Sequence, residues 1–167
     1  MRKYVLYSVF AISCFLMLTS GVEDDNGKAG RTGSPNEQTC VDGCHNSYAL
    51  NSGSGNTVIT SNIPNWEYTP GTSYTINVTC THQGAPLFGM GFEALKTGNT
   101  NGGTLTPGTG TQIKTSGGKT NIVHQLNGGA TANSHTFTFT WVAPASGTGN
   151  VNFYWSNVAD SGDNGNK

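Results

Sequence analysis

The stretch "SHTFTFTWVAP" (residues 134–144) gives the clearest indication of how this chain folds. Successive side chains of a β-strand point to opposite faces, so this stretch has an aromatic side and a threonine side. The first carries His135, Phe137, Phe139 and Trp141, and the second carries Thr136, Thr138 and Thr140. The alternation predicts a strand of an antiparallel sheet that buries its aromatic face and leaves its threonine face in water.

Five further stretches show a similar short pattern, and clusters of Gly, Pro, Asn and Ser separate them. They span residues 56–62, 73–82, 87–96, 119–126 and 149–157. No helical period of useful length lies between them, which excludes βαβ units. Several short strands joined by turns predict an all-β, immunoglobulin-like antiparallel β-sandwich. In "SYTINVTCTH" (73–82), Cys80 falls on the apolar face, where we expect a buried, unreactive thiol.

Composition and the N-terminal segment indicate an exported protein. Charged residues make up 10 % of the chain and the net charge is −1, which argues against nucleic-acid binding. "MRK" followed by an apolar run predicts a signal peptide over residues 1–21, cleaved near Gly21. A retained membrane anchor and lipidation at Cys14 are the alternatives. We therefore expect a periplasmic, cell-surface or secreted protein with no membrane span in the mature chain.

The mature chain is expected to have two parts. Residues 22–55 are polar and Gly-rich, and we interpret them as an irregular leader, mobile until it becomes ordered near the first cysteine. Residues 56–167 form the β-sandwich domain. The chain stops at "SGDNGNK" (161–167), which has the composition of a turn and nothing to pair with. We expect that the natural protein continues beyond it.

The leader contains "CVDGCH" (40–45), which admits three interpretations. Covalent attachment of haem c needs two thiols, here Cys40 and Cys44, that add to the porphyrin vinyl groups, and a following histidine, His45, that reaches the iron. The usual spacing is one residue shorter, although Gly43 allows the backbone to bulge. A Cys40–Cys44 disulfide is the second interpretation, because paired cysteines outside the cell usually form one. Zinc is the third, and it would need a distant fourth ligand.

If haem is attached, a sixth iron ligand is needed. We favour His124, because an imidazole among apolar neighbours needs a partner. The alternatives are Met90, whose flanking glycines allow a flat ring to approach, His135 at the start of its strand, and His82. Each also has an ordinary structural explanation, as core filler or as a hydrogen-bonded histidine.

The sequence resembles the bacterial choice-of-anchor V family, which is related to the Reeler (reelin-like) β-sandwich domain. The resemblance covers roughly residues 28–167 and rests on the segments "GRTGSPNEQTC…CH" (30–45), "FGMGFEALK", "IVH" and "FTFTWVAPASGTGNVNFYWSNVADSGDNGN". It implies an exported protein with a Reeler-like fold, a cytochrome-like Cys/His motif and no enzymatic activity. It also implies a histidine at the position of His124.

Two functions remain open. The first is an exported haem c protein that transfers electrons to an unknown redox partner or senses a redox ligand. The second is a non-catalytic surface or adhesion module, in which Cys40 and Cys44 form a disulfide and polar loops or the loop residue Trp66 contact a surface ligand. No Ser-His-Asp order, paired-carboxylate site or phosphate loop stands out, so we do not expect an enzyme.

Overall fold

The computed structural model describes residues 26–42, 45 and 48–160. The expected signal peptide, Cys14, Cys44 and residues 161–167 lie outside this part of the chain. Nine strands and one short 3-10 helix follow each other along the described residues. They are β1 (Asn56–Ser61), η2 (Pro64–Trp66), β2 (Ser73–Thr81), β3 (Leu87–Lys96), β4 (Thr100–Asn101), β5 (Thr104–Thr106), β6 (Thr111–Ser116), β7 (Lys119–His124), β8 (Ser134–Val142) and β9 (Val151–Asp160).

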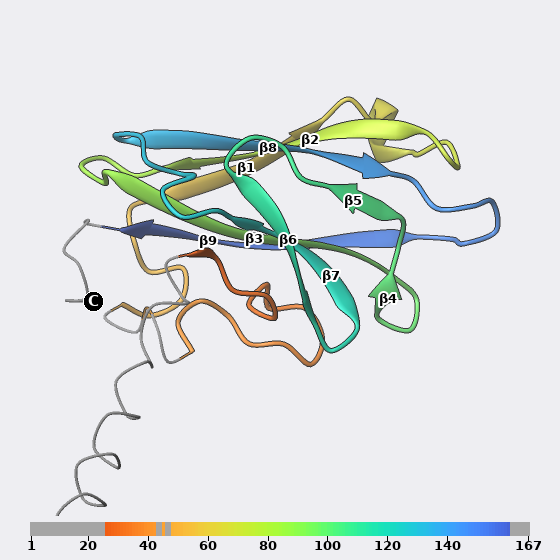
Figure 1. The fold of residues 1–167 in the computed structure, drawn as a ribbon, viewed down its shortest axis with the longest axis horizontal. Coiled ribbons are helices and arrows are strands. Elements are labelled where there is room, and N and C mark those ends of the chain that lie inside the picture. The colour runs from red at the N-terminus through yellow and green to blue at the C-terminus, as the bar shows by residue number, and fades with distance from the viewer. Residues whose placement is uncertain (1–25, 43–44, 46–47, 161–167) are drawn as a thin grey trace, which may run out of the picture.

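The strands form two sheets that face each other, as the alternation predicted (Figure 1). Sheet A has the order β1-β2-β8-β5. Sheet B has β3 at its centre, with β9 on one edge and β4, β7 and then β6 on the other. All pairings are antiparallel, and the longest joins β3 to β9, from Leu87 opposite Asp160 to Lys96 opposite Val151. The chain is an all-β antiparallel sandwich.

The core lies between the sheets and contains the apolar faces that the sequence indicated. Phe92 of β3 packs on Phe139 of β8, with ring centroids 4.7 Å apart. Trp141 is also fully buried, and its indole N–H donates to the carbonyl of Gly102 over 2.8 Å. Cys80 is 3 % exposed, and its burial raises the pKa of the thiol to about 12. The expected burial of this thiol is confirmed, and a raised pKa is in keeping with the low reactivity expected of it.

Strands β4, β5 and β6 lie in a region that the sequence analysis had interpreted as turns. β6 shows no apolar alternation in the sequence, because Ile113 is its one large apolar residue. That side chain is 43 % exposed. β4 and β5 have only two and three residues, too few to show a period. The strand predicted over residues 119–126 is two residues too long, because β7 ends at His124. Leu126, which was expected on its apolar face, is 60 % exposed.

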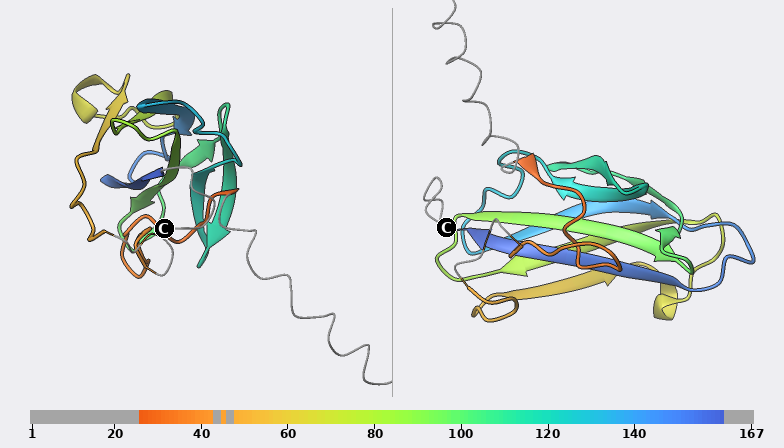
Figure 2. Two further views of the ribbon diagram at one scale, coloured as in Figure 1. Left: turned by 90° about the vertical axis from the view of Figure 1, so that its left-hand side faces the viewer. Right: turned by 90° about the horizontal axis from the view of Figure 1, so that it is seen from below.

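The leader is packed against the sandwich, which corrects the expectation of a mobile segment. Residues 26–42 run across the outer side of sheet B, over β3 and β9 (Figure 2). They contain no strand, in keeping with the expected irregular leader, but Thr32 and Ser34 are buried. The leader lies very close to the end of β6 at Gly30, since a Cβ there would lie 2.6 Å from Ser116 Oγ. In the described part of the chain, no helix is long and apolar enough to cross a membrane.

Candidate functional site

The outer face of sheet B carries the leader and two of the predicted ligands, Cys40 and His124. Even-numbered residues of β3 point into the core, so Gly89, Gly91 and Glu93 point outward, toward the leader. The two glycines leave this strip without side chains. Leader and neighbouring strands therefore lie close to the backbone of β3, and Gly91 is itself buried.

Cys40 lies over β9, beside the Gly91 end of this strip. Its sulfur is 3.2 Å from Ser156 Oγ and 3.9 Å from the carbonyl oxygen of Arg31. Ser156 stands opposite Gly91 in the β3–β9 register, and its hydroxyl donates to the same Arg31 carbonyl over 2.7 Å. Because the serine proton is used in that bond, the cysteine thiol is the donor to Ser156 Oγ. Cys40 is therefore positioned by its side chain as well as by the leader backbone.

The ring of His124 lies over Gly89. This glycine is two residues from Gly91 on β3 and points to the same outer face. A Cβ on Gly89 would be 3.0 Å from the imidazole Cε1. Nδ1 of His124 is 3.1 Å from the Met90 amide nitrogen and 3.3 Å from the Met90 carbonyl oxygen. Nδ1 can accept from the amide in one tautomer or donate to the carbonyl in the other. The second tautomer leaves a lone pair on Nε2, which is how metal-binding histidines are usually held.

The other candidate ligands lie elsewhere. Met90 is 3 % exposed and belongs to the core between the sheets. His135 is on β8 of sheet A, where its ring packs on Phe137 and Nδ1 is 2.9 Å from Thr131 Oγ1. His82 follows β2, with Nε2 3.4 Å from Ser54 Oγ. Of the four histidine and methionine candidates, His124 alone shares the outer face of sheet B with Cys40.

His45 is half-buried, and its backbone N–H donates to the carbonyl of Cys40 over 3.1 Å. Cys44 lies outside the described residues, so neither its distance to Cys40 nor its bonding state is defined. Within the described part of the chain, no group of three or more His, Cys, Asp or Glu side chains is placed to hold a metal ion.

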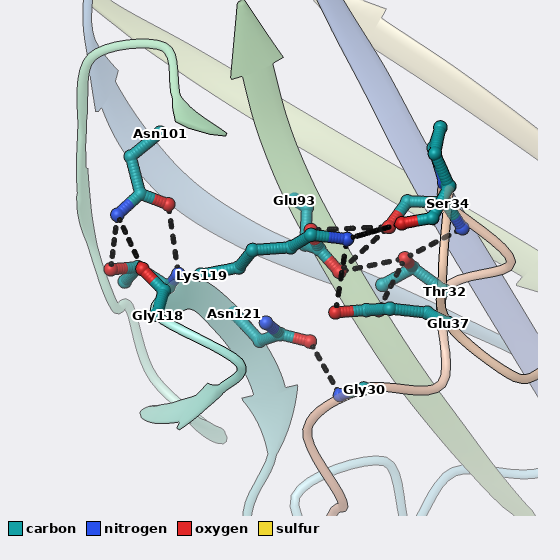
Figure 3. Close-up of polar contacts among 11 residues, drawn as sticks. Gly30, Thr32, Ser34, Glu37, Glu93, Asn101, Gly118, Lys119 and Asn121 are labelled. Carbon is teal, nitrogen blue, oxygen red and sulfur yellow. Dashed lines mark hydrogen bonds and ion pairs between the residues drawn. The ribbon is translucent and has the colours of Figure 1, made fainter. Parts of the chain in front are cut away.

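A buried polar cluster, which the sequence analysis missed, fastens the leader to sheet B (Figure 3). Glu93 is 0 % exposed, and Thr32 Oγ1 of the leader donates to its carboxyl over 2.8 Å. Lys119 Nζ, from β7, donates to Ser34 Oγ and to the Pro35 carbonyl, both over 2.8 Å.

The cluster also contains a second carboxyl. Glu37 Oε1 is 3.5 Å from Lys119 Nζ, and Glu93 Oε2 is 3.9 Å from it. Asn121 of β7 is 0 % exposed, and its side-chain oxygen accepts from the Gly30 N–H over 3.1 Å. The structure thus contains the paired carboxylates that the sequence analysis did not find. Both carboxyl groups are buried where the leader meets sheet B, so the cluster anchors the leader.

The two carboxyl groups have opposite pKa shifts. Burial, together with the neighbouring Glu37, raises the pKa of Glu93 to about 7. Burial also opposes ionisation of Glu37, but hydrogen bonds from Glu93 and Thr32 and the charge of Lys119 lower its pKa overall. One signal in the sequence could have identified the site: Glu93 is a lone acid within the apolar strand "FGMGFEALK".

Trp66 lies at a second, separate feature, a groove of about 320 Å³ at the open edge between β1 and β9. Its indole is 54 % exposed and packs edge-on against Phe153, with ring centroids 6.4 Å apart. Asn65 and Trp66 have φ angles of 51° and 61°. Positive φ is unfavourable for a residue as large as tryptophan, and such strain often occurs at ligand sites. The groove is lined by Ile59, Ile63, Trp66, Tyr68, Trp141, Val151, Asn152, Phe153 and Trp155.

Comparison with known proteins gives a likeness of fold alone. No model of a known protein family matches the chain, and no curated protein does. Among similar solved structures, a fragment of the human F-spondin reeler domain is 22 % identical, covers 63 % of this chain and 76 % of its own, and has a TM-score of 0.49. The Reelin-N domain of F-spondin is 23 % identical over 63 % and 73 %, also with a TM-score of 0.49.

A second human F-spondin reeler fragment is 25 % identical over 61 % of this chain and 77 % of its own, with a TM-score of 0.45. These matches are to the domain that the sequence motifs resembled. Their scores are too low to carry an argument about function. Membership of the choice-of-anchor V family stays an expectation from the sequence.

Proposed function

We propose that this chain is an exported haem c-binding β-sandwich protein that transfers electrons, or senses a redox ligand, outside the cytoplasm. Cys40 and Cys44 would form the thioether bonds, and His45 and His124 would be the axial ligands. The observation that carries this proposal is that Cys40 and His124, 84 positions apart in the sequence, share the outer face of sheet B, where Cys40 contacts Ser156 of β9, opposite Gly91, and the His124 ring lies over Gly89 of β3. An attached haem supplies one-electron exchange between Fe(III) and Fe(II).

The described residues fit such a group in three respects. The Cys40 thiol is a weak donor to Ser156, so converting it to a thioether costs little in that contact. Nδ1 of His124 can donate to the Met90 carbonyl, which orients the ring and keeps Nε2 unprotonated, as iron ligation requires. Gly89 is only half-buried, so the His124 end of the strip is not sealed by protein. The leader's buried anchor holds these groups in place.

A visible spectrum of the denatured protein tests the proposal. The chain should be expressed with a haem c maturation system, because a covalent haem stays with the polypeptide after unfolding. We expect a coloured wild type and loss of covalent haem in Cys40→Ala and Cys44→Ala. In folded protein, His124→Ala should change the spectrum, whereas His135→Ala, on sheet A, should not. A colourless wild-type chain, with the two cysteine sulfurs bonded to each other by mass spectrometry, would contradict the proposal.

That last result would favour the second candidate, a non-catalytic surface or adhesion module. The aromatic groove and the strained, exposed Trp66 support this candidate. No charged side chain lines the groove, which suits a neutral ligand. Binding to glycan or protein arrays should then be lost in Trp66→Ala and kept in Cys40→Ala. The low net charge predicts that docking with a redox partner or a surface ligand depends little on salt.

A further inference from the structure

The leader segment 26–42 is called the strap below. In the polar cluster that anchors the strap to sheet B, two carboxyl groups face only one ammonium group. Thr32 Oγ1 lies 2.8 Å from Glu93 Oε1 and 3.1 Å from Glu37 Oε2. Ser34 Oγ lies 3.4 Å from both oxygens of Glu93. Lys119 is the positive charge that faces both carboxyls.

Charge balance in this cluster requires a proton. With both carboxyls ionised, the buried group would have a net charge of −1, and an uncompensated buried charge is strongly unfavourable. Thr32 Oγ1 lies within hydrogen-bond distance of both carboxyls but has one proton to donate, so the second carboxyl can hydrogen-bond to this oxygen only if it carries a proton of its own. One proton between them makes the cluster neutral and supplies the missing donor.

We propose that the strap is a proton-controlled clasp: Glu93 and Glu37 hold a single proton between them, and the strap docks on sheet B with uptake of that proton. Lifting the strap exposes both carboxyls to water, where neither carboxyl needs the shared proton. The strap carries Cys40, so the clasp also sets how firmly Cys40 is held against Ser156 of β9. That last consequence rests on the proposed function, whereas the proton site itself does not.

The sign of the pH dependence follows from the two carboxyls. The pKa of Glu93 is raised from 4.5 to about 7, so its contribution to docking is full below pH 4.5 and is lost as pH rises to 7. The pKa of Glu37 is lowered, so its contribution is full above pH 4.5 and is lost as pH falls below that value. Docking is therefore strongest near pH 4.5 and weakens toward neutrality.

Other groups around Glu93 do not supply a competing charge in this range. Tyr154 of β9 stands opposite Glu93 in the strand register. Asn121 of β7 is uncharged. Arg31 of the strap hydrogen-bonds to Gln38, on the leader's own surface. Lys119 is the one cation paired with either carboxyl among the described residues.

Hydrogen exchange of the strap amides tests the clasp in the full mature chain. The reporters are the Gly30 N–H, bonded to Asn121, and the Gly33 N–H, bonded to the Gln38 carbonyl. After correction for the intrinsic pH dependence of exchange, protection should fall by up to about tenfold per pH unit between pH 5 and 7. Amides of β8 should show no such fall. Glu93→Gln, which mimics the protonated acid, should remove the pH dependence, and the exposed Glu67→Gln should keep it.

Several results would overturn the clasp. Strap protection that is flat between pH 5 and 7, or a Glu93→Gln variant that keeps the wild-type slope, rules out a proton on Glu93. If Glu93→Gln does not fold, carboxyl carbon NMR of the wild type decides, because both carboxyls ionised at pH 6 would exclude the shared proton. Cys44→Ala, which cannot form two thioethers, should keep the pH dependence, so failure of haem attachment and failure of the clasp are distinguishable.

Discussion

The two outer faces of the sandwich are both polar, but one meets water and the other meets protein. On sheet A, the Thr79 and Thr136 hydroxyls lie 2.9 Å apart across two strands, and Thr138 donates to Asn77 over 2.8 Å, and both of these hydrogen bonds are exposed. On sheet B, Glu93 and Asn121 are 0 % exposed beneath the strap. The first face keeps water as an alternative partner for every hydroxyl, and the second must satisfy its polar groups internally.

Because of this difference, similar hydrogen bonds should contribute differently to the free energy of unfolding on the two faces. An exposed hydrogen bond replaces one to water and contributes little, whereas a buried group that loses its partner costs its full desolvation penalty. Hydrogen-bond distances alone do not distinguish the two cases, since 2.8 Å contacts occur on both faces. Matched substitutions on the two faces can measure the difference.

The largest effect is expected for Lys119→Met. Removing this ammonium group leaves the ionised Glu37 buried without its cation, and breaking a buried pair costs about 3 kcal/mol or more. Urea unfolding at pH 7 should show that loss in the free energy of unfolding. The loss should shrink at acid pH, where Glu37 can also be protonated. Lys96→Met, at the half-buried C-terminal end of β3, is the control. Equal and small effects of the two variants would mean that the strap is not anchored through Lys119.

An intermediate effect is expected for Thr32→Val, compared with Thr136→Val on sheet A. Both variants lose a hydroxyl with similar size and shape, but Thr32 donates to the buried Glu93 and Thr136 pairs with an exposed hydroxyl. We expect a loss of about 1–2 kcal/mol for Thr32→Val and less than about 0.5 kcal/mol for Thr136→Val. Denaturation curves with unchanged slopes would give both values. The reverse order would contradict the contrast between the faces.

The smallest effect on stability is expected for Gly89→Ala, with Gly91→Ala as its control. A Cβ on Gly89 would be 3.0 Å from the His124 ring, whereas one on Gly91 would be 3.5 Å from Ser156 Oγ, an ordinary contact. Gly89→Ala should cost about 1 kcal/mol and displace the imidazole, which NMR of the His124 ring would detect. Gly91→Ala should leave that ring unchanged. An unmoved ring in both variants would show that His124 does not depend on the bare backbone of β3.

The alternation in the sequence located the core strands well. Residues 87–96 were predicted as a strand and are β3, and Phe137, Phe139 and Trp141 face the core as expected. The pattern failed where strands have little of it, as in β6, whose side chains are mostly polar. Strand pairing across the sheet holds such segments in place, and a single stretch of sequence does not carry that information.

The candidate site, like the fold, was only partly predictable from the sequence. His124 was selected from the sequence for its apolar neighbours, and the structure places it on the face that Cys40 occupies. Whether the two share an iron is still a prediction. Glu93 was passed over because its partners, Thr32 and Lys119, are 61 and 26 positions away. Long-range partners of this kind leave no local pattern.

The amino-acid pattern was sufficient to establish an all-β sandwich, to assign the aromatic residues to its core and to single out the Cys/His segment, because strand alternation and motif spacing are local properties. The pattern could not establish that one polar face is covered. That depends on the strap folding back over β3, which buries Glu93 beside Glu37 and turns two solvated acids into a pair that needs a shared proton. Burial and pairing set the charge of such groups, and both arise only when distant segments meet.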